Sequence, residues 1–428
     1  MIPVAWEEIA GLALGRLERG DDDGRITAIG ADSRTATRGS LFVALNTGVD
    51  YVGEARLRGA AVLVPDHQHA ALAALARLVG SRSSSRVVAV VGSTGKTTTK
   101  DVLGALCAAV VPTVFAHASL NNEIGVPLTV CRLEPETAVL ILELGMRGPG
   151  QIAALCEIAR PDLVLVTSIG PEHLEIVGTV EDVARANAEA IEALPPGGIA
   201  VVPAAGRAPE LEPFLGRGDI DVRRVDPRDV RSDGGEAVFR VGERELRLRL
   251  PFVRRHLVEN TLAALVAYDA LGLPLGRAQE GASRIELSPW RGEETVLPGG
   301  GLVVNDAYNA NPTSMRAALL DLAERAGGRR RVAILGEMAE LGERSGDFHR
   351  EIGSVVAATV DALVAVGERA RLYQEPGVGE MRFAADPVAL EGLLPALLRP
   401  GDVVLVKASR AVGLEGIPER VAKIAQTW

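Results

Sequence analysis

The chain has 428 residues, 47% of them hydrophobic, and a formal net charge of −10. This length favours two to four domains with sizeable cores. The acidic balance argues against a general nucleic-acid-binding protein, and every apolar run is shorter than the roughly 18 residues that a membrane-spanning helix needs.

Residues 1–83 are predicted to form a small α/β domain. No basic region followed by an apolar core opens the chain, so we expect no signal peptide. Residues 41–45 and 61–64 have the pattern of short buried strands, and residues 70–79 that of an alanine-rich helix. Ser33 and Arg34 offer a hydroxyl and a guanidinium that suit a diphosphate or a uracil, with a surface turn as the alternative. The small, polar residues 80–86 are typical of a linker.

Residues 87–91 are apolar and mostly β-branched, which predicts a buried strand. A glycine-rich turn follows, and residues 97–110 are predicted to form a helix. Strand, glycine turn, Lys-Thr and helix is the order of a phosphate-binding loop, although only two residues separate its glycines where the general pattern has four. The alternative is a glycine turn before an ordinary helix. The loop residues that we expect to contact a nucleotide are Gly92, Ser93, Thr94, Gly95, Lys96, Thr97 and Thr98.

The remainder of a central domain, residues 84–293, alternates strands and helices. A second apolar strand, residues 137–142, ends at Glu143, where a Mg²⁺ ligand is expected beside the loop strand. A third strand, residues 162–166, is followed by His173. Helices are predicted at 151–160, 180–194 and 257–271, and a hairpin within 234–251 around Gly242-Glu243. This alternation predicts a doubly wound, mostly parallel sheet.

Residues 294–428 are predicted to form a third, Rossmann-like α/β domain. It begins with a hairpin of residues 295–297 and 302–305, and continues with strands at 332–335, 362–366 and 403–406. Cys107, Cys131 and Cys156 form no CxxC pair and lie in apolar runs, which is typical of a reducing compartment. We therefore expect a cytoplasmic protein with no nucleic-acid or membrane partner.

Taken together, these features resemble the Mur ligase family, the ATP-dependent amide-forming enzymes of peptidoglycan synthesis. The resemblance covers nearly the whole chain, and the short glycine loop matches the family's form of the motif. It implies ATP and Mg²⁺ as cofactors. It also implies nucleotide contacts from Asn260, Arg291, Asp306, Tyr308 and Asn309, catalytic roles for Lys96, Glu143, His173 and Arg291, and metal binding by Thr97, Glu143 and His173.

Residues 121–127, residues 306–315, and residues 335–342 with His349 after them most resemble one branch of the family. That branch joins D-Ala-D-Ala to UDP-N-acetylmuramoyl-tripeptide, through an acyl phosphate formed with ATP. The resemblance implies these small molecules as substrates, and we expect a monomer. It implies substrate binding by Ser33, Arg34, Asn121, Asn122, Asn311, His349 and Lys407. Whether the third peptide residue is lysine, diaminopimelate or ornithine stays open.

Two segments depart from the family pattern. Residues 46–53 lack the usual Asp-Gly-His, which leaves uracil contacts there open. Asn187 stands where the family has a lysine that is carbamylated to bind a second Mg²⁺. Asparagine has no amine to carbamylate, so we expect His173, the substrate carboxylate, phosphate and water to hold that ion, with Asn187 at most assisting.

Several of these residues also have structural interpretations. His173 suits a strand-end histidine, Arg291 a linker ion pair, His349 helix packing, and Asn309 and Asn311 turns. Two other functions are alternatives. A folylpolyglutamate-synthase-like ligase shares the short loop but has no reason to carry residues 311–315. A nucleotide-driven switch would need a guanine-reading Asn-Lys-x-Asp, which the sequence lacks.

Overall fold

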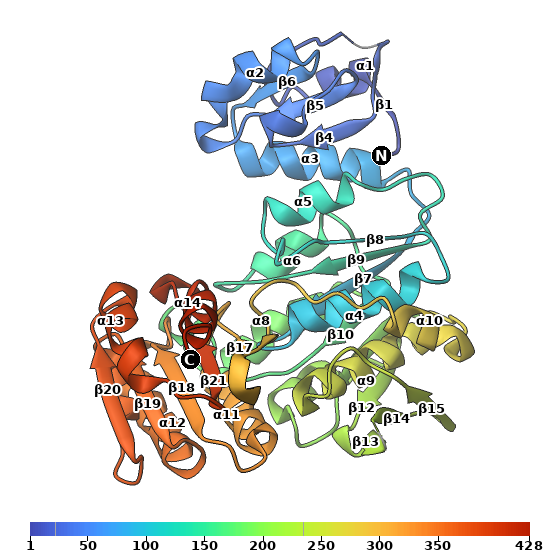
Figure 1. The fold of residues 1–428 in the computed structure, drawn as a ribbon. Coiled ribbons are helices and arrows are strands. Elements are labelled where there is room, and N and C mark those ends of the chain that lie inside the picture. Colours follow the sequence, from blue (N-terminus) through green and yellow to red (C-terminus); the bar gives the residue numbers. More distant parts are fainter. Residues whose placement is uncertain (22, 234) are drawn as a thin grey trace. The chain divides into compact units, whose positions relative to one another are not determined.

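The computed structural model describes residues 1–21, 23–233 and 235–428. The chain divides into two compact units, each built of strands and helices (Figure 1). The first comprises Met1–Ser168, Arg185–Pro251 and Glu259–Glu286, and the second Ile169–Ala184, Phe252–Val258 and Leu287–Trp428. The division into three domains at residues 83 and 293 stays a prediction. Within the described residues, no helix has both the length and the apolar character needed to cross a membrane.

The amino-terminal part of the first unit has a four-stranded sheet in the order β2-β6-β5-β4. Its strands are β2 (Gly15–Glu18), β4 (Ala28–Gly30), β5 (Ser40–Val43) and β6 (Ala61–Pro65). The short strands β1 (Val4–Ala5) and β3 (Arg25–Ile26) pair separately, and the helices are α1 (Trp6–Gly11), α2 (Val52–Leu57) and α3 (Gln68–Gly80). The predicted strands and helix of this region are confirmed as β5, β6 and α3.

A six-stranded sheet in the order β12-β11-β10-β7-β9-β8 forms the centre of the first unit, and all its pairs are parallel. Its strands are β7 (Arg86–Val91), β8 (Thr113–Phe115), β9 (Val139–Glu143), β10 (Leu163–Val166), β11 (Ile199–Pro203) and β12 (Asp221–Val225). This order confirms the predicted doubly wound parallel sheet. After β7 the chain forms β8 and β9 on one side of it, and then β10, β11 and β12 on the other side. The loop after β7 therefore lies at a topological switch point, where α/β sheets bind ligands.

The helices of this part of the chain are α4 (Lys96–Ala108), α5 (Gly125–Val130), α6 (Gln151–Cys156), α8 (Val180–Glu192), α9 (Arg255–Ala270) and α10 (Ala278–Ala282). A three-stranded antiparallel sheet contains β13 (Val230–Asp233), β14 (Glu236–Val241) and β15 (Arg244–Leu248). Strands β14 and β15 confirm the predicted hairpin, whose turn contains Gly242 with a φ of +59°. Gly234, the first residue of that predicted stretch, lies outside the described residues.

The second unit contains another six-stranded sheet, in the order β16-β17-β21-β18-β19-β20, in which only β16 is antiparallel to its neighbour. Its strands are β16 (Glu293–Val296), β17 (Leu302–Asn305), β18 (Arg331–Gly336), β19 (Ala362–Val366), β20 (Glu380–Ala384) and β21 (Val403–Lys407). Its helices are α7 (Leu174–Val177), α11 (Pro312–Ala326), α12 (Ser345–Thr359), α13 (Pro387–Leu397) and α14 (Ile417–Ala425). The predicted Rossmann-like arrangement is confirmed.

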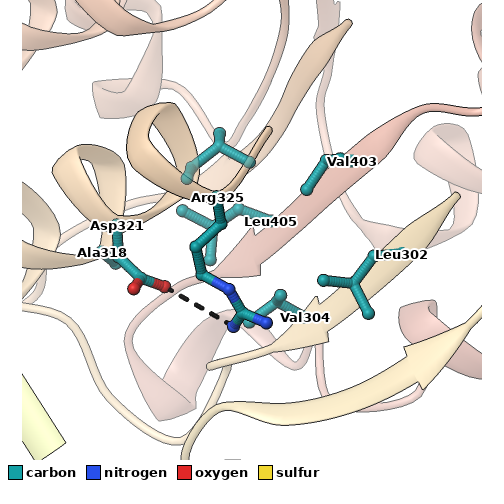
Figure 2. A pocket seen from close by; sticks show the side chains of 8 residues that line it. Leu302, Val304, Ala318, Asp321, Arg325, Val403 and Leu405 are labelled. Atoms are coloured by element: carbon teal, nitrogen blue, oxygen red, sulfur yellow. Dashed lines mark ion pairs between the residues drawn. The ribbon is translucent and has the colours of Figure 1, made fainter. Parts of the chain in front are cut away.

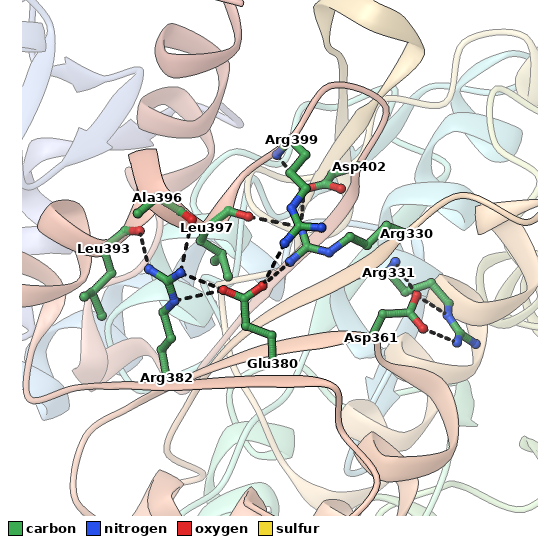
Figure 3. Close-up of polar contacts among 10 residues, drawn as sticks. All are labelled: Arg330, Arg331, Asp361, Glu380, Arg382, Leu393, Ala396, Leu397, Arg399 and Asp402. Carbon is green, nitrogen blue, oxygen red and sulfur yellow. Dashed lines mark hydrogen bonds and ion pairs between the residues drawn. The ribbon is translucent and has the colours of Figure 1, made fainter.

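Charged side chains tie together the amino ends of the strands in this second sheet (Figure 3). Glu380, at the start of β20, accepts hydrogen bonds from Arg330 at 2.7 Å and from Arg382 at 2.6 Å. Arg330 also donates to Asp402 at 2.9 Å. Ligand sites in such sheets lie at the carboxyl ends of the strands, so we assign this network to stability.

A small, mostly apolar pocket lies between β17, β21 and α11 (Figure 2). Its lining residues are Leu302, Val304, Ala318, Asp321, Leu322, Arg325, Val403 and Leu405. Asp321 lies 3.5 Å from Arg254 and 4.0 Å from Arg325. Burial nevertheless raises the pKa of Asp321 to about 6, so desolvation outweighs the attraction of the two guanidinium groups.

Candidate active site

The predicted phosphate-binding loop joins β7 directly to α4. Gly92 has a φ of +124° and Gly95 a φ of +81°, which strain any residue with a Cβ. A Cβ at Gly92 would lie 2.4 Å from Oγ1 of Thr167, and one at Gly95 would lie 2.8 Å from Oδ1 of Asn260. Both glycines are therefore required by the backbone conformation and by the close approach of their neighbours.

The end of β10 anchors this loop. The N–H of Ser93 donates to the carbonyl of Ser168 at 2.8 Å, and the N–H of Thr94 donates to Oγ of Ser168 at 3.0 Å. Thr167 donates its hydroxyl to the carbonyl of Thr94 at 2.6 Å. Thr167 and Ser168 directly follow the predicted strand 162–166 and were not among the predicted site residues. Their position at the carboxyl end of a strand beside the loop strand was the signal for this role.

The predicted helix is confirmed as α4, which begins at Lys96, one residue before the predicted start, and continues with Thr97. The ammonium group of Lys96 folds back onto the loop and donates to the carbonyl of Gly92. Thr97 is buried, and its hydroxyl lies 3.0 Å from Oγ of Ser119. Thr98 is buried in the same first turn. The positive side chain and the helix N-terminus thus share one location, which suits a polyphosphate.

Glu143 ends β9 and pairs with Val90 in the loop strand, so it lies at the same edge of the sheet. It is 1% exposed. Its Oε1 accepts a hydrogen bond from the Asn121 amide at 2.8 Å, whereas Oε2 has no hydrogen-bond partner within the part of the chain that the structure describes. An unpartnered buried carboxylate oxygen is costly, and a cation would satisfy it. Thr97 and Glu143 therefore fit a Mg²⁺ ion.

The loop that carries Asn121 and Asn122 is held by a lysine whose role the sequence did not reveal. Lys100 is fully buried, donates to the carbonyls of Ala116 and Ala118 at 2.6 and 2.7 Å, and pairs with Asp101 at 2.8 Å. Asn122 accepts from the N–H of Gly125 at 2.9 Å, so its side chain shapes the turn before α5. Asn121 contacts Glu143 instead.

In the second unit, Asp306 and Lys407 extend from the adjacent strands β17 and β21. The Lys407 ammonium donates to Oδ2 of Asp306 at 2.7 Å and to the carbonyl of Asn309 at 2.9 Å, and it is 2% exposed. The guanidinium carbon of Arg291 lies 4.0 Å from the centre of the Tyr308 ring, a cation–π arrangement. Four of the predicted site residues therefore form two close pairs at the carboxyl end of this sheet.

Asn309 and Asn311 have local structural roles. The side chain of Asn309 accepts from the N–H of Ala310 at 2.9 Å. Asn311 caps helix α11, because its side chain accepts from the N–H of Ser314 at 2.9 Å and its own N–H donates to the Ser314 hydroxyl at 3.0 Å. The structure thus supports the turn interpretation of both residues, and a substrate or nucleotide contact stays a prediction.

His173 and His349 have different surroundings. The Nδ1 atom of His173 contacts Oε2 of Glu340, and a carboxylate that holds one ring nitrogen is the usual partner of a metal-binding histidine. His349 is fully buried: it accepts at Nε2 from the N–H of Met338 at 3.1 Å, and its Nδ1 donates to the carbonyl of Ser345 at 2.6 Å. Burial lowers the pKa of His349. The histidine therefore holds the 337–341 loop, and a direct substrate contact stays a prediction that this geometry does not favour.

In the amino-terminal part of the first unit, Ser33 opens a 3₁₀ turn after β4, is buried and donates to Oε2 of Glu54 at 2.8 Å. Arg34 is exposed and forms a forked ion pair with Asp32, which lowers the pKa of Asp32 to about 2. The hydroxyl of Ser33 is thus engaged within the fold, and Arg34 is the more accessible group. Both remain predicted substrate contacts.

Comparisons with known proteins agree with this geometry. The Mur ligase middle domain matches residues 90–268, and the Mur ligase glutamate ligase domain matches residues 291–410. UDP-N-acetylmuramoyl-tripeptide--D-alanyl-D-alanine ligase from Escherichia coli is 31% identical and aligns with 97% of this chain and 98% of its own length. The crystal structure of MurF from Acinetobacter baumannii superposes with a TM-score of 0.85 at 26% identity, covering 98% of this chain and 99% of that one. MurF from Thermotoga maritima, crystallised with ADP, gives a TM-score of 0.79 at 28% identity and covers 94% of this chain and 98% of that one. The chain therefore belongs to the Mur ligase family.

Proposed function

We propose that the chain joins D-alanyl-D-alanine to UDP-N-acetylmuramoyl-tripeptide with ATP, forming ADP, phosphate and UDP-N-acetylmuramoyl-pentapeptide for peptidoglycan synthesis. The observation that carries this proposal is the match with the Escherichia coli ligase of that name over 97% of this chain. The phosphate-binding loop and the buried Glu143 supply the groups that such a reaction needs.

The reaction needs ATP because a carboxylate has no good leaving group for attack by an amine. Oxide cannot leave, so ATP first phosphorylates the carboxylate, and the dipeptide amine then attacks the acyl phosphate and expels phosphate. Negative charge accumulates on the transferring phosphoryl group, so the site must supply positive groups. Lys96 and the N-terminus of α4 are proposed to stabilise that charge.

A Mg²⁺ ion bound with the nucleotide would neutralise phosphate charge and orient the phosphoryl group. The hydroxyl of Thr97 and the unpartnered Oε2 of Glu143 are proposed to hold it. His173 is proposed as a ligand of a second Mg²⁺ ion near the substrate carboxylate, because the contact with Glu340 orients its ring. In this assignment Asn121 orients Glu143 and does not itself contact the metal.

Other predicted residues are proposed to bind the substrates. Arg291, Asp306 and Tyr308 would contact the nucleotide, with Lys407 fixing Asp306. Asn260, whose side chain lies close to Gly95, would also contact the nucleotide. Ser33 and Arg34 would contact the diphosphate or the uracil of the UDP group.

We propose a cytoplasmic monomer. Cys107, Cys131 and Cys156 are all free and buried, and burial raises the pKa of each thiol to about 12, as suits unreactive thiols in a reducing compartment. ATP and UDP-linked substrates are also cytoplasmic metabolites. Analytical ultracentrifugation is expected to show a single species of 44.9 kDa.

Phosphate release measured with each substrate omitted in turn tests the function. We expect release only when ATP, UDP-N-acetylmuramoyl-tripeptide and D-Ala-D-Ala are all present, together with a pentapeptide product in the mass spectrum. Tripeptides ending in lysine, diaminopimelate and ornithine should be compared to identify the third residue. Phosphate release that does not depend on D-Ala-D-Ala would favour a nucleotide-driven switch. Addition of glutamate to a folate would favour the folylpolyglutamate-synthase-like alternative.

A further inference from the structure

Helix α8 carries one polar residue into the core of the first unit. The other buried positions of α8 in this unit are apolar, among them Ala186, Ala188 and Ile191, while Asn187 is 1% exposed. A buried amide is costly unless it is hydrogen-bonded, so its presence among alanines calls for a specific partner.

That partner is the phosphate-binding loop. Oδ1 of Asn187 accepts a hydrogen bond from the N–H of Gly92 at 2.7 Å, across 95 residues of sequence. Gly92 is the first residue after β7, and its φ of +124° lies in a region that glycine adopts readily but other residues do not. Because glycine has so many accessible backbone conformations, a contact is needed to fix the orientation of its peptide group. The hydrogen bond to Asn187 of α8 fixes this orientation.

The same glycine is held from its other side. Its carbonyl accepts from the ammonium of Lys96, so Asn187 and Lys96 hold the N–H and the C=O of one residue. The next two N–H groups, of Ser93 and Thr94, are bound by Ser168. The first half of the loop is thus fixed to the protein by two elements, α8 and the end of β10.

We propose that Asn187 is a positioning residue that fixes the first peptide of the phosphate-binding loop and, through Gly92, the resting place of Lys96. Phosphate contacts then fall to the second half of the loop at the start of α4. The amide oxygen accepts from Gly92, so its role in this proposal is to hold the loop and not to bind a metal ion. The positioning role in catalysis rests on the proposed function, whereas the contact itself does not.

The direct test is hydrogen–deuterium exchange of the Gly92 amide, read from overlapping fragments that begin at least three residues before Gly92 and differ only in whether they include it. In the wild-type protein this amide should be protected. Asn187→Leu removes the acceptor at similar volume and should lose that protection, whereas Asn187→Asp keeps an acceptor oxygen and should retain it. Both variants lose the Nδ2 donor, so the difference between them isolates Oδ1.

Glu189 supplies a matched control on the same helix. Its carboxylate accepts from the N–H groups of Gly150 and Ala153 at 2.6 and 2.9 Å, so it anchors a different loop. Asn187→Leu should weaken ADP binding about tenfold, raise the KM for ATP and lower kcat, with the KM for D-Ala-D-Ala unchanged. Glu189→Gln should leave ADP affinity within twofold of the wild type.

Rapid exchange of Gly92 in the wild-type protein would overturn the proposal, and this measurement needs no variant to fold. Equal exchange in the leucine and aspartate variants, or equal ADP affinity in Asn187→Leu and the wild type, would also overturn it. A chain that bound no adenine nucleotide would refute the proposed function, while the exchange experiment would still decide whether Asn187 holds the loop.

Discussion

Asn121 donates its amide to Oε1 of Glu143 at 2.8 Å, while Oε2 of the same carboxylate is buried without a partner in the described part of the chain. One oxygen is thus oriented by the protein, and the other is the oxygen that we propose binds a cation. A fold optimised for stability alone would not bury this charge, so the pair marks a position where stability is given up for function.

Glu143→Gln should therefore separate activity from stability. The amide keeps the shape and a partner for Asn121 but removes the buried charge, so we expect ligation to fall at least about 100-fold and the free energy of unfolding to stay level or rise by about 1 kcal/mol. Initial rates over a Mg²⁺ titration and urea denaturation measure the two effects. A variant that lost stability and activity together would indicate a structural role.

Lys96→Ala should abolish ligation and leave the fold intact. The ammonium group donates to the carbonyl of Gly92 on the loop surface of the site, and its charge is needed where the phosphoryl group transfers. Circular dichroism and product formation are the measurements. Lys423, an exposed lysine of α14, gives a control, since Lys423→Ala should remain within twofold of the wild type. Ligation by Lys96→Ala within tenfold of the wild type would remove the basis of the assignment.

Asp306 and Lys407 should show strong energetic coupling. Lys407→Met leaves Asp306 partly buried and unpaired, and Asp306→Asn leaves the ammonium buried, so each should destabilise the protein by about 3 kcal/mol. The double variant should be less destabilised than the sum of the two single variants. The difference should be about 1 kcal/mol or more, as is typical of residues in contact. Urea unfolding of the four proteins tests this. Simple additivity would mean that the two side chains do not interact in the folded protein.

Asp321 should make the protein less stable as the pH rises from about 4 to 6. Burial raises its folded pKa to about 6, above the ordinary value of an aspartate, so the folded state binds a proton more tightly than the unfolded state. The cost of the buried charge is absent at pH 4 and complete above pH 6, and it amounts to about 3 kcal/mol for a shift of this size. Asp321→Asn should therefore stabilise the protein at pH 7.5 and have little effect at pH 4.

Asp361 provides the opposite case for that experiment. Its carboxylate binds Arg331 at 2.6 Å, and this hydrogen bond lowers the pKa of Asp361. Asp361→Asn should therefore be less stable than the wild type at neutral pH. The difference in unfolding free energy should shrink as the pH falls and the wild-type carboxylate becomes protonated. If both variants changed stability in the same direction at pH 7.5, the burial argument for Asp321 would be wrong.

The sequence predicted what is local and missed what depends on distant contacts. The loop after β7 was predictable because strand, glycine turn and helix follow one another within a few residues. The contacts of Asn187 and Ser168 with that loop span 95 and 74 or 75 residues, and no local pattern encodes them. Strand β20 was missed although Glu380 and Arg382 alternate with apolar residues, a pattern typical of a strand. The hydrogen bond that holds Glu380 comes from Arg330, 50 residues away, and no local pattern indicates it. His349 matched a motif, but only the fold shows that both its nitrogens are used internally.

Bicarbonate should have no effect on the wild-type reaction, which follows from the residue at position 187. A carbamate needs a lysine amine and carbon dioxide, and asparagine offers no amine. Oδ1 of Asn187 is instead bound to the N–H of Gly92. Activity should accordingly need higher Mg²⁺ than in lysine-bearing relatives, since one anionic oxygen ligand is absent.

The variant Asn187→Lys extends this test. Lysine has donors but no acceptor, so the variant loses the contact with Gly92 and should be much slower than the wild type. Bicarbonate would convert the amine into a carbamate, whose oxygens can accept from Gly92 or bind Mg²⁺, and should restore part of the rate. Initial rates against Mg²⁺, with and without bicarbonate at fixed pH and ionic strength, compare the two proteins. A several-fold response of the wild type would mean that another residue carries the carbamate, and that the position assigned to Asn187 is wrong.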